Sequence, residues 1–181
     1  RHAHRAGVLV SYDPNYRAPL WNNPEEAAQW MAIPLPLVDV IKLSEEELPL
    51  LTGTRDPEEG SRLLEERGIS LILVTLGERG AFCRWRGESF SVPGASVQVA
   101  DTNGAGDTFL GAVLARLCRR VGGPLAGLTT EELRDILTYG ETVELDTIRD
   151  VLENQIQCNR AISQAGLAGH YGAEVGATLR G

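Results

Sequence analysis

The chain has 181 residues, 43% of them hydrophobic, which is enough to bury the core of one main domain. Its formal net charge of −8 argues against a surface that neutralises nucleic-acid phosphates or anionic lipid, and no run approaches the ~20 apolar residues of a membrane span. Neither nucleic acid nor a membrane is therefore expected as a partner. Three widely spaced cysteines form no C-x-x-C pair and leave one over, which favours a reducing compartment, the cytoplasm.

Short apolar runs alternate with helical patterns through residue 74. Strands are expected at residues 7–12, 38–43 and 69–74, and helices are expected to begin near residues 23, 44 and 56. The resulting order is strand, helix, strand, two helices and strand. Such alternation predicts an α/β fold with a parallel sheet flanked by helices on both faces, whose ligands gather at the carboxyl ends of the strands.

The second half of the chain changes character. Two short antiparallel strands are expected at 81–85 and 89–92, a further strand at 97–100, and helices at 107–120, from 129 onward and at 145–164. The last of these helices is amphipathic and leads into a glycine-rich end. We therefore expect a helical C-terminal tail after the sheet.

The segment Asp101-Thr-Asn-Gly-Ala-Gly-Asp107 stands between a predicted strand and a predicted helix. Its glycine amides would point into the ligand cleft at the positive end of that helix and form an anion cradle. Asp107 is placed to accept the proton of a hydroxyl that attacks a phosphoryl group. By itself, the pattern is also explained by a tight turn with Asp107 as the helix cap, so the segment alone leaves both interpretations open.

The longer string from Asp101 to Ala112 resembles the second signature of the PfkB, or ribokinase, family of carbohydrate kinases. The resemblance implies a ribokinase-like fold, with Asp107 as the catalytic base. The backbone amides of Gly104, Ala105 and Gly106 would form the anion hole. It also implies ATP and Mg²⁺ as cofactors, and Asp101 matches a position that helps to hold a monovalent cation in many relatives.

Two further segments resemble the same family in the right chain order. Asp13 to Trp21 is similar to a stretch of fructokinases and 2-keto-3-deoxygluconate kinases, which implies that Asn15 and Arg17 line the substrate and phosphate cleft. Val74 to Ala81 resembles the nucleotide-binding turn, which implies that Thr75 and Gly77 approach ATP. Without the family, Arg17 would be expected to be a solvated loop residue, and the turn would be an ordinary one.

Ser44-Glu-Glu-Glu47 resembles the family's N-x-x-E helix, with Ser44 in the place of the asparagine. The resemblance implies that Glu47 organises Mg²⁺ and its waters near the phosphates. Serine followed three residues later by glutamate is also a capping box, which closes the start of a helix without any metal. A purely structural role for Glu47 therefore stays open.

The resemblance covers about residues 7–137, which correspond to the C-terminal part of a typical family member. We therefore expect an incomplete kinase domain at residues 1–137 and a helical tail of foreign character at 138–181. Part of this tail, from Cys158 to Leu179, is similar to a piece of the cysteine desulfidase and serine dehydratase-like family. The chain is accordingly expected to be truncated or fused at both ends.

These features predict ATP-dependent phosphorylation of a sugar hydroxyl. Fructose is the leading substrate, while 2-keto-3-deoxygluconate, another sugar or a nucleoside stays open. The alternative is a non-catalytic nucleotide-binding remnant, or a fusion fragment related to a cysteine desulfidase. Whether this chain is active alone, and whether the complete protein is a homodimer, also stay open.

Overall fold

The computed structural model describes residues 2–94 and 105–142. The strands of this part form one sheet in the order β1-β2-β3-β4-β5. Their bounds are β1 (Ser11–Tyr12), β2 (Val40–Ser44), β3 (Leu71–Thr75), β4 (Ala81–Trp85) and β5 (Glu88–Val92). The first three strands run parallel, whereas β4 and β5 form the expected antiparallel hairpin. The sheet is therefore mixed, with a parallel part at the β1 side.

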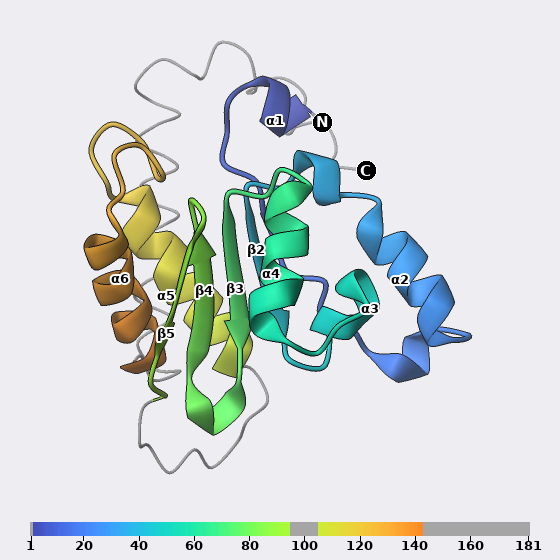
Figure 1. The fold of residues 1–181 in the computed structure, drawn as a ribbon. Coiled ribbons are helices and arrows are strands. Elements are labelled where there is room, and N and C mark those ends of the chain that lie inside the picture. Colours follow the sequence, from blue (N-terminus) through green and yellow to red (C-terminus); the bar gives the residue numbers. More distant parts are fainter. Residues whose placement is uncertain (1, 95–104, 143–181) are drawn as a thin grey trace, which may run out of the picture.

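Helices cover both faces of this sheet, as the alternation predicts. The helices of the described part are α1 (His2–Arg5), α2 (Pro24–Ala32), α3 (Leu48–Thr52), α4 (Pro57–Glu66), α5 (Ala105–Cys118) and α6 (Thr130–Thr142). Three 3₁₀ turns, η1 (Ala18–Leu20), η2 (Leu35–Leu37) and η3 (Gly77–Arg79), lie between them. Helices α5 and α6 pack on one face, and α2, α3 and α4 pack on the other (Figure 1). The described residues include no helix long and apolar enough to cross a membrane.

The buried strands alternate between two apolar cores. Val40 and Leu73 face the core that contains α5 and α6, whereas Ile41, Leu43 and Ile72 face the core that contains α2, α3 and α4. A strand that is covered on both faces needs apolar side chains at successive positions. This requirement explains the near-continuous apolar runs of β2 and β3.

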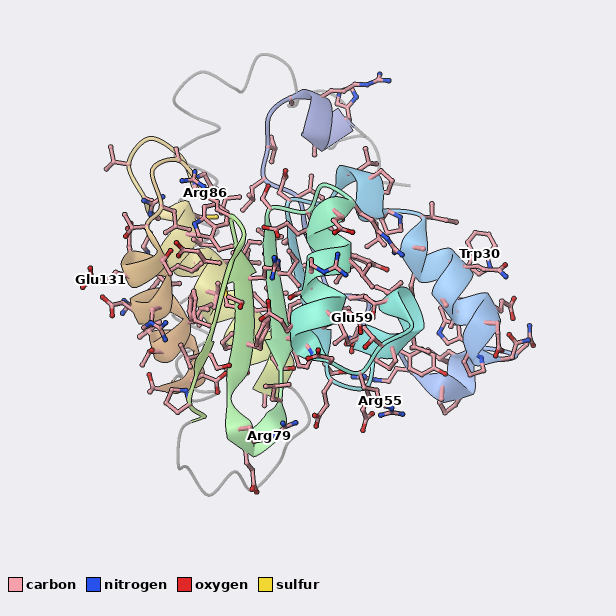
Figure 2. The ribbon with its side chains drawn as sticks, in the orientation of Figure 1. Trp30, Arg55, Glu59, Arg79, Arg86 and Glu131 are labelled. Atoms are coloured by element: carbon pink, nitrogen blue, oxygen red, sulfur yellow. The ribbon has the colours of Figure 1, made fainter. Side chains whose placement is uncertain are left out.

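Side-chain caps begin the helices where the sequence predicts them. Asn23 Oδ1 accepts the N–H of Glu26 at 2.7 Å at the start of α2. Thr129 Oγ1 likewise accepts the N–H of Glu132 at 3.2 Å, which satisfies an otherwise unpaired donor at the start of α6. Trp30, the tryptophan of α2, projects away from the sheet into solvent (Figure 2).

Two elements begin later than predicted. The strand expected at 7–12 is reduced to β1. The Val8 N–H donates to the Ala3 carbonyl at 3.0 Å in the turn after α1, and the Val10 N–H donates to the side chain of Asp39 at 2.8 Å, so neither donor joins the ladder. The helix expected from Ser44 begins at Leu48, because Ser44 still pairs with Thr75 in the parallel ladder. The strand expected at 97–100 and the helix expected at 145–164 lie outside the described residues.

Glu141 supplies a test of the packing at the end of α6. It is half-buried, and burial raises the pKa of its carboxyl from 4.5 to about 7. The folded state therefore holds the Glu141 proton more tightly than the unfolded state does. The resulting contribution to the unfolding free energy is fully present below about pH 4.5 and is lost as the pH rises through about 7. Glu141→Gln removes this dependence, so between these pH values the wild type should lose about 1 kcal/mol of unfolding free energy relative to the variant, after allowance for solvent screening.

Urea denaturation at both pH values measures this difference. Glu131→Gln is the matched control, because Glu131 is exposed on the first turn of the same helix (Figure 2). If Glu141→Gln and wild type show the same pH dependence, the carboxyl is not desolvated in solution.

Candidate functional site

The carboxyl ends of the three parallel strands bring three predicted segments to one edge of the sheet. β1 is followed directly by Asp13, β2 ends at Ser44, and β3 ends at Thr75. The Glu45 N–H donates to the Thr75 carbonyl at 3.0 Å, which joins the turns after β2 and β3. In open sheets of this kind, the carboxyl edge is where ligands bind. The structure thus gathers the segments on which the sequence analysis places substrate, metal and nucleotide.

Glu47 fixes two of these segments to each other. The carboxylate is buried, with 5% of the residue exposed, and its Oε1 accepts the N–H of Tyr16 at 2.6 Å while its Oε2 accepts the N–H of Ser44 at 2.7 Å. Ser44 Oγ accepts the N–H of Glu47 at 3.2 Å in return. The capping-box hydrogen bonds are therefore formed. The additional bond to Tyr16 makes Glu47 the anchor of the loop after β1.

Asp13 and Lys42 form a second link that sequence reasoning missed. Lys42 Nζ lies 3.0 Å from Asp13 Oδ2, and Asp13 Oδ1 accepts the N–H of Asn15 at 3.1 Å. Asn15 adopts a left-handed backbone, with φ of 49°, which this short-range hydrogen bond supports. A lysine in an otherwise apolar strand is the signal in the sequence that could have identified this pair.

Asn15 and Arg17, the predicted substrate and phosphate residues, both have exposed side chains. The Arg17 Nη1 donates to the carbonyl of Tyr16 at 3.3 Å. The loop backbone that carries the two residues is held by Asp13 and Glu47, so its shape is set by buried groups. Its exposed side chains are accordingly available to a ligand.

The first turn of α5 lies against the same edge. A Cβ added to Gly106 would stand 2.7 Å from Lys42 Nζ, so the α5 backbone and the Lys42 ammonium are in close contact. Ala105 and Asp107, on either side of Gly106, are exposed. Of the predicted anion-hole and cation residues, Gly104 and Asp101 lie outside the described residues.

The predicted nucleotide turn follows β3. Thr75 is half-buried at the end of the strand, and its Oγ1 donates to the carbonyl of Leu43 at 3.4 Å. Gly77 is exposed and takes a positive φ of 60°, which glycine tolerates at little cost. Arg79, at the tip of this turn, pairs with Glu45 after β2 (Figure 2). The turn is thereby tied to the β2 end of the site.

Within residues 2–94 and 105–142, no group of three or more His, Cys, Asp or Glu side chains could hold a metal ion. Magnesium is commonly bound by one or two carboxylates together with phosphate oxygens and water. The described carboxylates of the segments at this edge are Asp13, Glu45, Glu46, Glu47, Glu78 and Asp107. This donor set fits a magnesium ion that arrives with a nucleotide better than a metal held by protein ligands alone.

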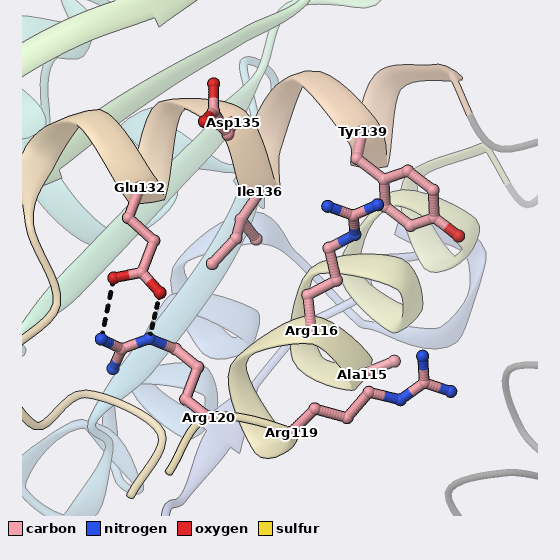
Figure 3. Close-up of a pocket in the computed structure, with 8 residues that line it drawn as sticks. All are labelled: Ala115, Arg116, Arg119, Arg120, Glu132, Asp135, Ile136 and Tyr139. Carbon is pink, nitrogen blue, oxygen red and sulfur yellow. Dashed lines mark hydrogen bonds and ion pairs between the residues drawn. The ribbon is translucent and has the colours of Figure 1, made fainter. Parts of the chain in front are cut away.

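A separate cavity of about 430 Å³ lies between α5 and α6 (Figure 3). It is lined by Ala115, Arg116, Arg119, Arg120, Glu132, Asp135, Ile136 and Tyr139. Arg120 makes two hydrogen bonds of 2.8 Å with Glu132, and the Arg116 guanidinium stacks on the Tyr139 ring at 3.6 Å from its centre. The cavity lies at the carboxyl-terminal end of α5, whereas Gly106 lies in the first turn of that helix. Because two of its arginines already have partners, we place the candidate site at the carboxyl edge.

The chain is similar to known proteins. The family model "pfkB family carbohydrate kinase" matches residues 1–143. Fructokinase-2 of Solanum lycopersicum is 43% identical over 118 residues, which are 64% of this chain and 35% of that protein. The chain thus spans about a third of the length of that relative.

Two solved structures show the same fold. The fructokinase of Xylella fastidiosa with bound ATP has a TM-score of 0.69 and 30% identity, covering 86% of this chain and 55% of that one. A double mutant of the Vibrio cholerae O395 fructokinase, in a form with fructose, ADP and potassium ion bound, has a TM-score of 0.68 and 34% identity, covering 77% and 44%. The prediction of a ribokinase-like sheet flanked by helices is confirmed.

Glu47→Gln tests the anchoring role of the buried carboxylate. Glutamine keeps one acceptor oxygen but turns an NH₂ group toward a backbone N–H, so one donor loses its partner. We expect unfolding free energy to fall by about 1 to 3 kcal/mol in urea denaturation. Glu46→Gln, at the exposed neighbouring position, should stay within about 0.5 kcal/mol of wild type. Equal effects at both positions would contradict the role assigned to Glu47.

Proposed function

The chain belongs to the pfkB family of carbohydrate kinases, and from this premise we propose that it carries the phosphoryl-transfer part of a kinase that uses ATP to phosphorylate a sugar hydroxyl. The observation that carries the proposal is the contact between Gly106 on α5 and Lys42 on β2, which brings the signature segment to the carboxyl edge. There it adjoins the loop after β1 and the turn after β2. The named relatives, all sugar kinases, support the same activity.

In the proposed reaction, Asp107 accepts the proton of the sugar hydroxyl while the hydroxyl oxygen attacks the γ-phosphorus of ATP in line. The bond from the γ-phosphorus to the bridging oxygen breaks, and ADP leaves with the bonding electrons. The exposed position of Asp107 on the first turn of α5 leaves its carboxylate open to a substrate. The backbone N–H groups of Gly104, Ala105 and Gly106 would stabilise charge on the transferring group.

Fructose is the proposed acceptor. The support comes from the Solanum fructokinase and from the Vibrio enzyme, whose structure contains fructose. Asn15 and Arg17 would contact the sugar or a phosphate, since a guanidinium can bind phosphate oxygens through two parallel hydrogen bonds. Thr75 and Gly77 would approach the nucleotide from the turn after β3.

The proposed cofactors are magnesium and a monovalent cation. Structures of the related fructokinases contain ATP, or ADP with potassium ion. Magnesium would neutralise charge on the phosphates, and Glu47 would organise its water shell while keeping its two backbone hydrogen bonds. Asp101 would help to hold the monovalent cation.

We also propose that a segment of different origin follows the kinase part. Helix α6 continues to Thr142 and the family match to residue 143, past the boundary expected at residue 137. We propose the cytoplasm as its location, because the three widely spaced cysteines of the sequence form no C-x-x-C pair and leave one over, which favours a reducing compartment.

Asp107→Asn tests the proposed base. For this test, the N-terminal part of a fructokinase relative is fused ahead of the chain. The kcat with fructose is then measured together with the thermal midpoint of the same protein. Asparagine has nearly the same shape as aspartate, and Asp107 is exposed on the first turn of α5, so the fold and ATP affinity should be nearly unchanged. Turnover should nevertheless fall by about 10² to 10⁴, because asparagine cannot accept the proton. An unchanged kcat would remove the role assigned to Asp107.

The same protein tests the substrate. We expect phosphorylation of fructose to exceed that of 2-keto-3-deoxygluconate, other sugars and nucleosides, measured as ADP formed per acceptor. Turnover of a nucleoside with no sugar phosphorylated would reject the fructokinase assignment. Binding of ATP with no turnover of any acceptor would instead favour the non-catalytic nucleotide-binding alternative.

A further inference from the structure

The cavity between α5 and α6 has a wall rich in arginine. Arg119 and Arg120 stand three and four residues after Arg116 at the carboxyl-terminal end of α5, and all three line the cavity. The lining also includes two carboxylates, Glu132 and Asp135, so its formal charge is +1 in a chain whose net charge is −8. An excess of positive charge in a hollow of an acidic protein favours a negatively charged ligand.

Arg120 has a structural role that the other two arginines lack. It bonds both carboxylate oxygens of Glu132, and its Nη1 donates to three carbonyls of the loop that follows α5. Arg116 turns toward Tyr139, and Arg119 extends away from Glu132 (Figure 3). Among residues 2–94 and 105–142, neither of these two guanidinium groups has a carboxylate or carbonyl partner. Within this part of the chain, their N–H donors are therefore available to an anion.

The helix dipole accounts for only part of this pattern. Cations are favoured near the last turn of a helix, where unpaired carbonyls carry partial negative charge. That effect needs no cavity, and side chains that extend freely into water would satisfy it. The Arg116 guanidinium is instead held over the Tyr139 ring, 3.6 Å from the ring centre. A guanidinium that is already held in place binds the oxygens of an anion at a lower cost in conformational entropy.

The size and the remaining lining of the cavity indicate what such an anion would carry. The volume of about 430 Å³ falls within the ~300–1,000 Å³ of small-molecule sites, so a phosphate ion alone would leave most of it empty. Ala115 and Ile136 offer apolar contacts, while the Tyr139 hydroxyl and the Asp135 carboxylate can bond hydroxyl groups. Arg116 covers one face of the Tyr139 ring, and the described lining holds no other ring on which a nucleotide base could stack. These features favour a phosphorylated sugar over a nucleotide.

We propose that this cavity is a second ligand site, which binds the phosphate group of a small sugar phosphate through Arg116 and Arg119. It is separate from the carboxyl edge and does not depend on ATP binding there, because the cavity and Gly106 lie at opposite ends of α5. Arg120 keeps the Glu132 carboxylate engaged, so this carboxylate does not compete with the phosphate for the other arginines. A sugar phosphate is also the class of molecule that the proposed reaction releases.

The experiment titrates the 181-residue chain with fructose 6-phosphate by calorimetry. Arg119→Gln and Arg116→Gln should each weaken binding about ten- to a hundredfold, the usual value of a hydrogen bond between charged groups. Both side chains are exposed, so the thermal midpoint of each variant should stay near that of wild type. Arg55→Gln is the matched control, because Arg55 is an exposed arginine between α3 and α4 and its loss changes the net charge equally (Figure 2). Its affinity should stay within about threefold of wild type.

Further titrations locate the site and identify its ligand. Fructose and inorganic phosphate should each bind at least about tenfold more weakly than fructose 6-phosphate, since each lacks half of the contacts. Equal binding of inorganic phosphate, or no binding of fructose 6-phosphate in the millimolar range, overturns the inference. So does unchanged affinity in both Arg116→Gln and Arg119→Gln, or a loss confined to Arg17→Gln, which places the ligand at the carboxyl edge. A fused protein that turns over no acceptor removes the proposed function and leaves this inference standing.

Discussion

The buried ion pair between Lys42 and Asp13 is the interaction on which the arrangement of the candidate site depends. It crosses from β2 to the loop after β1, and the same ammonium touches the start of α5 at Gly106. Glu47 completes the assembly by holding the loop and its own turn through backbone N–H groups. Buried charges of this kind contribute little net stability, but removing one partner is costly. The pair therefore specifies where the segments lie more than how stable they are.

Much of the fold could be predicted from residues close in sequence. Apolar runs predict β2 and β3, and the cap at Asn23 predicts the start of α2, because these features depend on neighbours along the chain. The shortening of β1 could not be predicted. It involves the Asp39 side chain, 29 residues away, which takes the backbone donor of Val10.

The candidate site was predictable in its segments but not in its connections. The signature around Asp107 and the Ser44 to Glu47 pattern identify two parts of the edge, while the bond from Tyr16 to Glu47 spans 31 residues and leaves no local pattern. For Glu47, the structural interpretation is confirmed by its hydrogen bonds, and its role toward magnesium remains a proposal. Lys42 was missed because a single lysine in a strand does not by itself reveal which segments it contacts.

The central claim is that ATP·Mg²⁺ binds at the carboxyl edge and not in the cavity between α5 and α6. Backbone hydrogen exchange, followed by mass spectrometry with and without ATP·Mg²⁺, tests it most directly. The account predicts slower exchange in peptides that contain Ala105–Asp107 and Thr75–Gly77. Slower exchange confined to peptides around Arg116 and Tyr139, or no change at any peptide, would contradict it.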